Sequence, residues 1–549
     1  MMLDPLSYIG TIVTVFAILA GRWVVTRVCR RHRQRDLPLP PGPPEKSWLG
    51  GNALDMPRTH PWVKFTEWAK TYGDVMHLRV HTNHIVVLSS YDAVMDLFEA
   101  RGALYSHRPR REMAFLMGRE KIMPFHGYDE DWKLYRRYAN QGFNKKVAVK
   151  YHAGQMRDVH IFLQRLVSNP ENFVQEFNML LGKIIMRVTY GYLVTDANDP
   201  HVTSSDEAIE SLGRVAMMGN YLVDSYPFLR HLPEWLPGMG FRVKAREWSK
   251  LPNRMANDPF EWTKEQMTTG TAAPSFLSEL LEQNQDGHYY AEEIIKWTAA
   301  SMYGGGAHTT ASILNNFILA MLLYPKVAQK AREEITRVVG LDRLPTISDR
   351  PDLPYLECLL LETLRWYPVT PLSIPRRVNQ NDVYRGYRIP ANSTVYNNVY
   401  TITRDENIFP DPENFIPKRF DEQGAGHKPL SPRDIIFGVG RRICPGQFLA
   451  EASIFSVMAN ILATMDITKV RDKNGREIEP EIVRGPALIC QLRPFKCICK
   501  DSSALEGFQR HQRHKRGGTF SGRLPETSQG LVFSNWSSSL FGLIGTYYV

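Results

Sequence analysis

The spacing of apolar residues predicts a chain built mainly of helices. Helical periodicity is clear in residues 61–72, 291–323, 326–339, 355–367 and 447–462. The last of these stretches is apolar on nearly all sides, which is typical of a helix buried in the core. We therefore expect a large helical body with at least one fully enclosed helix.

A smaller part of the chain has the pattern of strands. Residues 75–81 and 84–88 are short runs rich in β-branched residues, separated by Thr82-Asn83, and they predict a strand pair. Residues 371–378 and 386–390 suggest a second sheet. Between 200 and 285, short apolar islands alternate with prolines, which we interpret as helices broken by loops.

The N-terminus has the composition of a membrane anchor. Residues 6–21 contain no charged residue, and the apolar character continues to Val28. A helix over this stretch would span roughly 35 Å, enough to cross a bilayer core. A cleaved signal peptide is the alternative, but its positive charge normally precedes the apolar run, whereas here six arginines overlap or follow it. We expect an uncleaved anchor at 1–30, followed by a basic and proline-rich hinge at 31–45.

Charge and cysteine content narrow the classes of partner. The 549 residues carry a formal net charge of +10, and the excess lies mainly near the two ends. This distribution favours a membrane surface over nucleic acid. The six cysteines form no paired C-x-x-C set, so they suggest neither a disulfide framework nor a zinc site. Residues 501–549 are rich in serine and glycine, and we expect this tail to be disordered.

The most informative stretch runs from Phe437 to Gly446, FGVGRRICPG. Cys444 precedes a helix-start signal in which Pro445 fits the first turn. A helix N-terminus favours a thiolate, glycines allow a flat ligand to approach, and Arg442 could reach an anionic group on that ligand. A buried structural cysteine in a tight turn is the alternative.

This string resembles the haem-binding loop of the cytochromes P-450, with Phe437, Gly440, Arg442, Cys444 and Gly446 at its fixed positions. The resemblance implies a mainly α fold with a small β lobe, in which residues 46–500 form the catalytic domain. It also implies haem b as cofactor, with Cys444 as the axial ligand of the iron.

Two further motifs fit the same family. Trp132 and Arg136 are four residues apart on a predicted helix, and the family uses this pair to hold a haem propionate. Residues 305–310 have the sequence GGAHTT, which resembles the oxygen-activation motif of the family. In that motif Thr309 would donate a hydrogen bond toward dioxygen and relay protons. His308 stands where the family usually has an acid. We hypothesise that it takes over part of the acid's role, with a merely packed or solvated histidine as the alternative.

The remaining family positions are structural or bind the cofactor. Glu362 and Arg365 match the Glu-x-x-Arg pair, and Arg419 would be its third member. These three are assigned to structure and haem incorporation. Arg377 matches a position that contacts a haem propionate.

The resemblance implies a monooxygenase that inserts one oxygen atom from O₂ into a small hydrophobic substrate. The nearest likeness is to fungal oxidases of secondary metabolism, and xenobiotic oxidation is also open. The expected partners are NADPH–cytochrome P-450 reductase, cytochrome b5 and membrane lipid. The expected location is the endoplasmic reticulum membrane, with a single span and a cytosolic catalytic domain. A haem-thiolate isomerase, dehydratase or peroxygenase, or a haem-binding protein without turnover, remains the alternative.

Basic residues on the body suggest where an electron donor would dock. Lys133, Arg137, Arg433 and Arg441 lie near the two haem motifs in sequence, and we expect them to form a cationic face. The alternative is that these residues are simply solvated.

Overall fold

A computed structural model describes residues 37–501, except 58, 169, 197, 217–220, 285–288, 422–429 and 486–487. The predicted anchor, the first part of the hinge and nearly all of the predicted tail lie outside these residues. The described chain forms two units, one of residues up to 110 together with 374–398, and one of residues 111–373 together with those from 399 onward.

The first unit contains the small sheets. Its elements are α2 (Pro61–Tyr72), β1 (Val75–Val80), β2 (Asn83–Leu88), α3 (Tyr91–Val94), η1 (Met95–Ala100), α4 (Gly102–Tyr105), β3 (Arg376–Arg377), β4 (Asp382–Tyr384), β5 (Tyr387–Ile389) and β6 (Thr394–Asn397). Four strands pair in the order β1-β2-β6-β3, and β4 pairs with β5. In the first sheet, β1 and β2 are antiparallel while β2 and β6 are parallel. The predicted helix at 61–72 is confirmed to the residue, because Pro61 opens it and Gly73 ends it.

The second unit is almost entirely helical. Its longer elements are α6 (Glu130–Phe143), α8 (His152–Ser168), α9 (Phe173–Tyr190), α10 (Pro200–Ala216), α11 (Phe241–Trp248), α12 (Lys250–Thr268), α13 (Phe276–Gln283), α14 (Tyr289–Leu323), α15 (Pro325–Val339), α16 (Pro354–Trp366) and α20 (Gln447–Thr464). Its shorter elements are α5 (Glu112–Leu116), η2 (Arg119–Lys121), α7 (Lys145–Ala148), η3 (Val149–Tyr151), η4 (Pro170–Asn172), η5 (Leu222–Asp224), η6 (Pro227–His231), η7 (Ile347–Asp352), α17 (Val399–Ile402), η8 (Pro417–Phe420), α19 (Arg433–Ile436) and η9 (Gly440–Arg442), with the strand pair β7 (Met465–Thr468) and β8 (Ile498–Asp501).

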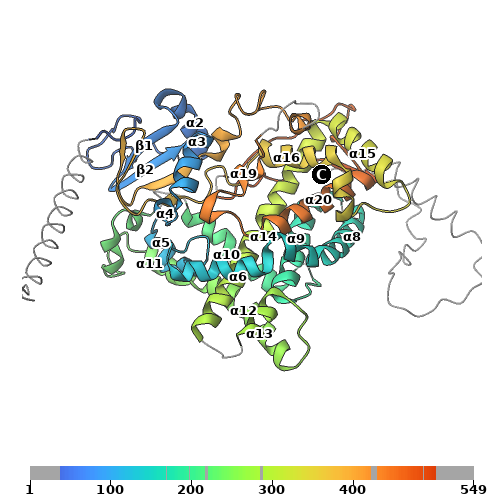
Figure 1. The fold of residues 1–549 in the computed structure, drawn as a ribbon, viewed down its shortest axis with the longest axis horizontal. Coiled ribbons are helices and arrows are strands. Elements are labelled where there is room, and N and C mark those ends of the chain that lie inside the picture. Colours follow the sequence, from blue (N-terminus) through green and yellow to red (C-terminus); the bar gives the residue numbers. More distant parts are fainter. Residues whose placement is uncertain are drawn as a thin grey trace, which may run out of the picture. The chain divides into compact units, whose positions relative to one another are not determined.

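Two long helices organise the core of this unit. Figure 1 shows α9 and α14 side by side, and α20 also packs against α14. Both α14 and α20 are apolar on nearly every side, so they are enclosed rather than amphipathic. The helix α14 ends at Leu323 because Pro325 cannot continue its hydrogen bonding, and α15 leaves at 105°.

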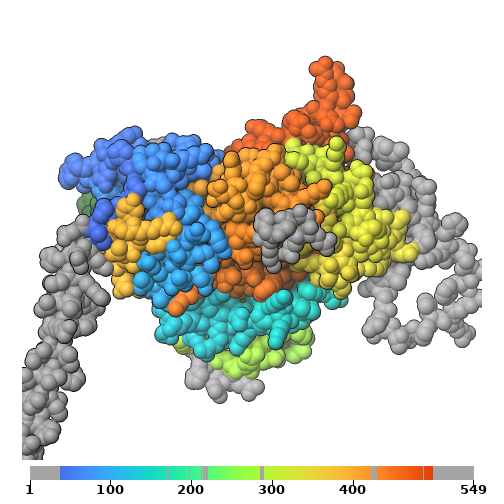
Figure 2. All heavy atoms as spheres, turned by 45° about the horizontal axis from the view of Figure 1, so that its top comes forward, coloured from blue at the N-terminus to red at the C-terminus, as the bar shows by residue number. Residues whose placement is uncertain are grey.

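The segment after α16 wraps back onto it. Figure 2 shows the orange segment with α17 and η8 beside the yellow segment that includes α16, and η8 contacts α16 directly. This return of the chain brings the predicted partners Glu362 and Arg419 together across 57 residues. The mainly α fold with small β sheets is therefore as the sequence predicted.

Candidate functional site

The loop between α19 and α20 is closed by its own backbone. The amide N–H of Cys444 donates to the carbonyl of Phe437 at 2.7 Å, and that of Ile443 donates to Gly440 at 3.0 Å. Gly438 and Gly440 have φ values of 75° and 62°, where a side chain would be strained. One expectation is corrected here. Pro445 precedes the helix instead of opening it, because Gly446 supplies the cap and its carbonyl accepts the first helical hydrogen bond, from Ala450.

The thiol of Cys444 lies in a partly enclosed position in front of α20. Burial raises the pKa of this thiol, and a hydrogen bond from the backbone of Gly446 together with the charge of Arg136 oppose that rise. The net direction differs from the sequence expectation, because desolvation outweighs the two stabilising groups. Coordination of a cysteine to a metal ion deprotonates it.

Helix α6 carries an indole that lies near two guanidinium groups of the same unit. Asp129 caps the helix by accepting from the N–H of Trp132 at 2.9 Å. The guanidinium of Arg136 lies 5.9 Å from the Trp132 ring centroid, and that of Arg442 lies 4.3 Å from it. Arg136 also donates to the carbonyl of Ile443 at 2.7 Å. The predicted pair and Arg442 are therefore brought together beside Cys444.

Arg442 has backbone partners in addition to the indole. Its Nη2 donates to the carbonyls of His126 and Gly127 at 2.8 and 3.0 Å. These contacts attach η9 to the segment before α6. The guanidinium groups of Arg136 and Arg442 thus form a local concentration of positive charge that suits an anionic ligand.

Arg377 belongs to the other unit, on β3. Its amide donates to the carbonyl of His107 at 2.8 Å, and its Nη1 donates to Oδ1 of Asn392 at 2.9 Å. Burial lowers the pKa of this guanidinium. Its Nε is buried and makes no hydrogen bond among the described residues. Arg377 thus presents a desolvated donor that an anionic group would satisfy.

The middle of α14 opens where the sequence places three glycines. A Cβ at Gly305 would meet no atom within 4 Å, whereas one at Gly306 would meet the side chain of Ile185 at 3.1 Å. Thr309 is partly exposed, and its hydroxyl donates to the carbonyl of Gly305 at 2.6 Å. Most residues on either side of this short stretch, such as Ala300 and Leu314, are buried. The glycines therefore expose one face of an otherwise enclosed helix.

His308 has a partner that the sequence did not indicate. Its Nε2 lies 2.9 Å from Oδ1 of Asp206, on α10. The side chain of His308 is 15% exposed and that of Asp206 is 42% exposed. The acid that is missing at position 308 is therefore present one contact away. Asp206 lies 102 positions earlier, in the poorly patterned region, so local spacing gives no signal for it.

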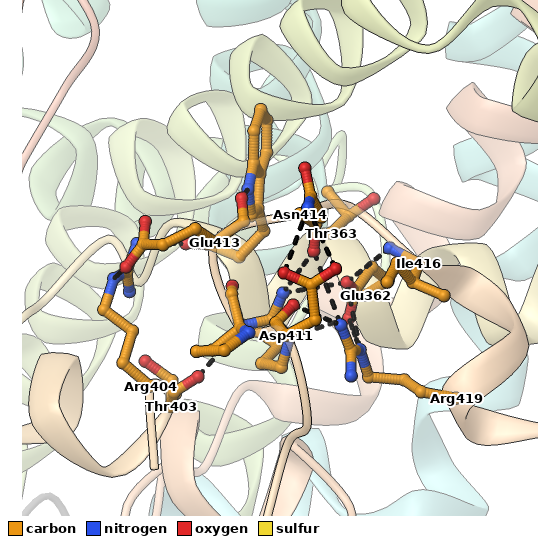
Figure 3. A network of polar contacts seen from close by, with 12 residues as sticks. Glu362, Thr363, Thr403, Arg404, Asp411, Glu413, Asn414, Ile416 and Arg419 are labelled. Atoms are coloured by element: carbon orange, nitrogen blue, oxygen red, sulfur yellow. Dashed lines mark hydrogen bonds and ion pairs between the residues drawn. The ribbon is translucent and has the colours of Figure 1, made fainter. Parts of the chain in front are cut away.

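The predicted structural triad is formed as Figure 3 shows, with Glu362 and Arg419 turned toward each other. Glu362 and Arg365 are both 0% exposed, and Nε of Arg365 donates to the carboxylate at 2.7 Å. Arg419 adds a contact at 3.2 Å and the amide of Ile416 one at 2.7 Å. Arg365 also donates to the carbonyls of Thr403, Pro412 and Asn414. Both charges are thus buried with their hydrogen-bonding capacity largely used.

A second charged cluster fixes the start of the cysteine loop. We call it the charge ring, formed by Arg350, Glu357, Arg433 and Glu451. Arg350 bonds Glu357 and Glu451 at 2.9 Å each, and Arg433 bonds Glu451 at 2.9 Å and also Glu357. Burial opposes ionisation of Glu357, but hydrogen bonds from the two arginines hold its pKa below the usual range.

The charge ring pairs one of the four arginine and lysine residues predicted to form the docking face. Arg433 is committed to two carboxylates within the chain. Lys133 pairs with Glu130 at 2.6 Å, and Arg441 bonds the hydroxyl of Tyr128. Of the four expected docking cations, Arg433 is therefore the one with the least charge to offer, because Glu357 and Glu451 neutralise it.

Comparison with known proteins gives a consistent result. The family model described as cytochrome P450 matches residues 40–490. Cytochrome P450 monooxygenases 208 and 98 of Postia placenta are 39% and 40% identical to this chain, over 85% and 86% of it and 91% of each relative. Cytochrome P450 monooxygenase claR of Ampulloclitocybe clavipes is 36% identical over 85% of this chain and 87% of its own length.

Proposed function

Because this chain belongs to the cytochrome P450 family, whose members bind haem b and incorporate oxygen from O₂ into organic substrates, we propose a specific assignment within it. The protein is a haem-thiolate monooxygenase that oxidises a small hydrophobic molecule of fungal secondary metabolism or a xenobiotic. Its electrons come from NADPH through cytochrome P-450 reductase, with cytochrome b5 as an additional donor. Residues 1–30 anchor it in the endoplasmic reticulum membrane, and the catalytic domain at 46–500 faces the cytosol.

The residues around the cysteine loop fit a haem. One thiol stands at the closed loop before α20, and the guanidinium groups of Arg136 and Arg442 lie close by. Gly446, like Gly305 on α14, has open space where a Cβ would stand. The helices α14 and α20 pack against each other, so the loop and the open helix face belong to the same unit. This combination of a single thiol, local cations and an uncovered helix face is the observation that carries the proposal.

Each side chain then has a defined task. Cys444 would ligate the iron, and a haem held by thiolate would supply the chemistry that cleaves the O–O bond. Arg136 and Arg442 would neutralise the propionates, with Trp132 supporting both guanidinium groups, and the propionate contact expected for Arg377 stays a prediction. Phe437 limits water at the sulfur, and the backbone of Gly440 and Gly446 keeps the loop tight. The Thr309 hydroxyl, which donates to the Gly305 carbonyl in this structure, would hold a proton for the reaction, and His308 would supply the next one.

The alternatives share the haem but not the electron source. An isomerase, dehydratase or peroxygenase turns over without NADPH, and a haem-binding sensor shows ligand-induced spectral change without product. A hydroxyl at Thr309 beside the open helix face favours oxygen reduction over these alternatives.

The function is tested with the full-length chain, NADPH and a fungal cytochrome P-450 reductase in phospholipid vesicles. We expect NADPH and O₂ to be consumed together only when the reductase is present. A screen of hydrophobic metabolites for the shift from low-spin to high-spin iron should then identify compounds that are converted to oxygenated products. Turnover of a hit with neither NADPH nor reductase would instead support the isomerase or peroxygenase alternative.

Filling the open face of α14 should exclude the haem. Gly305→Leu places a branched side chain where a Cβ now meets no atom, and leucine is favoured over glycine in a helix by about 1 kcal/mol. The variant should therefore fold while its haem content falls to a small fraction of the wild-type value, measured by pyridine haemochromogen absorbance per mole of chain. Gly305→Ala is the matched control and should keep its haem. Full haem content in Gly305→Leu would show that this face does not border the cofactor.

A further inference from the structure

The contact between His308 and Asp206 joins two elements with different roles. Helix α14 carries Thr309 and the open face, while α10 packs mainly against α12. The 2.9 Å contact from Nε2 to Oδ1 links α10 to α14. A carboxylate at one imidazole nitrogen fixes the ring orientation and which nitrogen carries the proton.

The exposed fractions of the two side chains show which member of the pair is closer to solvent. Asp206 is 42% exposed and can exchange protons with solvent, whereas His308 is 15% exposed and adjoins Thr309 in the helix. Among the described residues, Nδ1 of His308 makes no hydrogen bond, so this nitrogen can serve a water molecule or a hydroxyl. The pair thus joins a solvent-accessible carboxylate to a less exposed imidazole that is next to Thr309 in the sequence.

We propose that Asp206 and His308 form a proton-delivery dyad that replaces the single acid usual at position 308, with Asp206 as a positioning residue supplied by α10. In the neutral ring, Nε2–H donates to the Asp206 carboxylate and Nδ1 carries no proton. Water protonates Nδ1, the carboxylate stabilises the imidazolium that forms, and Nδ1 passes this proton on through water toward the site, which returns the ring to its neutral form. No charge is left behind, because one proton enters for each that leaves. This inference rests on the proposed function and concerns the same site.

Proton delivery to the site can be measured without a known substrate, from the products of O₂ reduction. With NADPH, O₂ and reductase alone, the enzyme can form peroxide (O₂ + NADPH + H⁺ → H₂O₂ + NADP⁺) or water (O₂ + 2 NADPH + 2 H⁺ → 2 H₂O + 2 NADP⁺). Cleavage of the O–O bond to water needs fast proton delivery, whereas slow proton delivery leads to release of peroxide. The measured quantity is therefore peroxide formed per NADPH consumed.

Asp206→Asn should lower the ratio of water to peroxide on the order of tenfold, in the range found when an outer carboxylate that orients a histidine is lost. Glu207→Gln is the matched control, because Glu207 is the exposed neighbour on the same helix, and it should behave as wild type. In the His308→Asp background, Asp206→Asn should instead raise the ratio of water to peroxide. The reason is that it removes the Asp206 carboxylate, which would repel the aspartate introduced at position 308. A purely structural ion pair would not reverse sign in this way.

A second readout does not depend on turnover. The melting temperatures of wild type, Asp206→Asn, His308→Gln and the double variant form a double-mutant cycle. If the two side chains interact, the shift in the double variant differs from the sum of the two single shifts. Equal peroxide yields in Asp206→Asn and Glu207→Gln, or additive melting shifts, would overturn the dyad. If Asp206→Asn does not fold, the His308→Asp/Asp206→Asn variant tests the dyad instead. The dyad requires that this double variant form water from O₂, and failure to do so would overturn it. Absence of any reductase-dependent NADPH oxidation in wild type would instead refute the proposed function, and the melting cycle would still report on the pair.

Discussion

Cys444→Ser is expected to abolish the red-shifted Soret band that a thiolate-ligated haem shows when it is reduced under carbon monoxide. Serine preserves the size of the side chain but is a poor iron ligand at neutral pH, so the electron donation that favours O–O cleavage is lost. Oxygenated product should fall below detection, a loss of at least about 10³-fold if one essential group is removed. The measurement is the reduced carbon monoxide difference spectrum of protein whose helical content is verified by circular dichroism.

Cys358→Ala is the matched control for this experiment. Cys358 is also a free, buried thiol in a helix of the same unit, but it lies beside Glu357 and not in the glycine loop. This variant should keep the thiolate-type band. A folded Cys444→Ser protein with an unchanged band would show that another residue ligates the iron, and the assignment of the loop would then fail.

Glu362→Gln should destabilise the chain by about 3–5 kcal/mol, the usual cost of leaving one member of a buried ion pair uncompensated. Arg365 is 0% exposed and has no other carboxylate within 4 Å among the described residues, so it cannot regain solvation without opening the core. Arg419 would lose the same partner. We expect a lower midpoint in denaturant unfolding and a matching loss of haem incorporation during expression.

The control is the surface pair of Arg343 and Asp349. It has a comparable geometry, but the arginine side chain is 49% exposed. Arg343→Gln should cost no more than about 1 kcal/mol, because solvent replaces the lost partner. Similar losses in Glu362→Gln and Arg343→Gln would mean that the buried triad contributes no more than an ordinary surface contact.

Local rules explain how much of the fold could be predicted. Proline and glycine mark helix ends by chemistry that needs no neighbours, so α2 and the α14–α15 break were predicted to within one or two residues. The four-residue spacing of Trp132 and Arg136 also follows from helix geometry alone. The helix predicted to begin at residue 447 is α20, which begins at Gln447, but Pro445 was placed in its first turn although Gly446 is the cap. The carbonyl of Phe437 holds the Cys444 amide in the loop, a contact that local propensity does not encode.

Long-range pairing explains what was missed at the candidate site. Asp206 and His308 meet across 102 residues, and Arg433 meets Glu357 across 76. No periodicity connects such positions, so the sequence named no partner for His308, and Arg433 was assigned to an external face. The family resemblance did not supply either contact, because it is carried by short motifs that do not include Asp206 or Glu357.

The charge ring has a mechanical consequence for the cysteine loop. Each of its two arginines contacts both glutamates, so any single contact can break in a thermal fluctuation while three others persist. The segment that leads to Cys444 is therefore held redundantly from η7, α16 and α20. Loss of one of the two Arg433 contacts would therefore leave the loop still attached through the other.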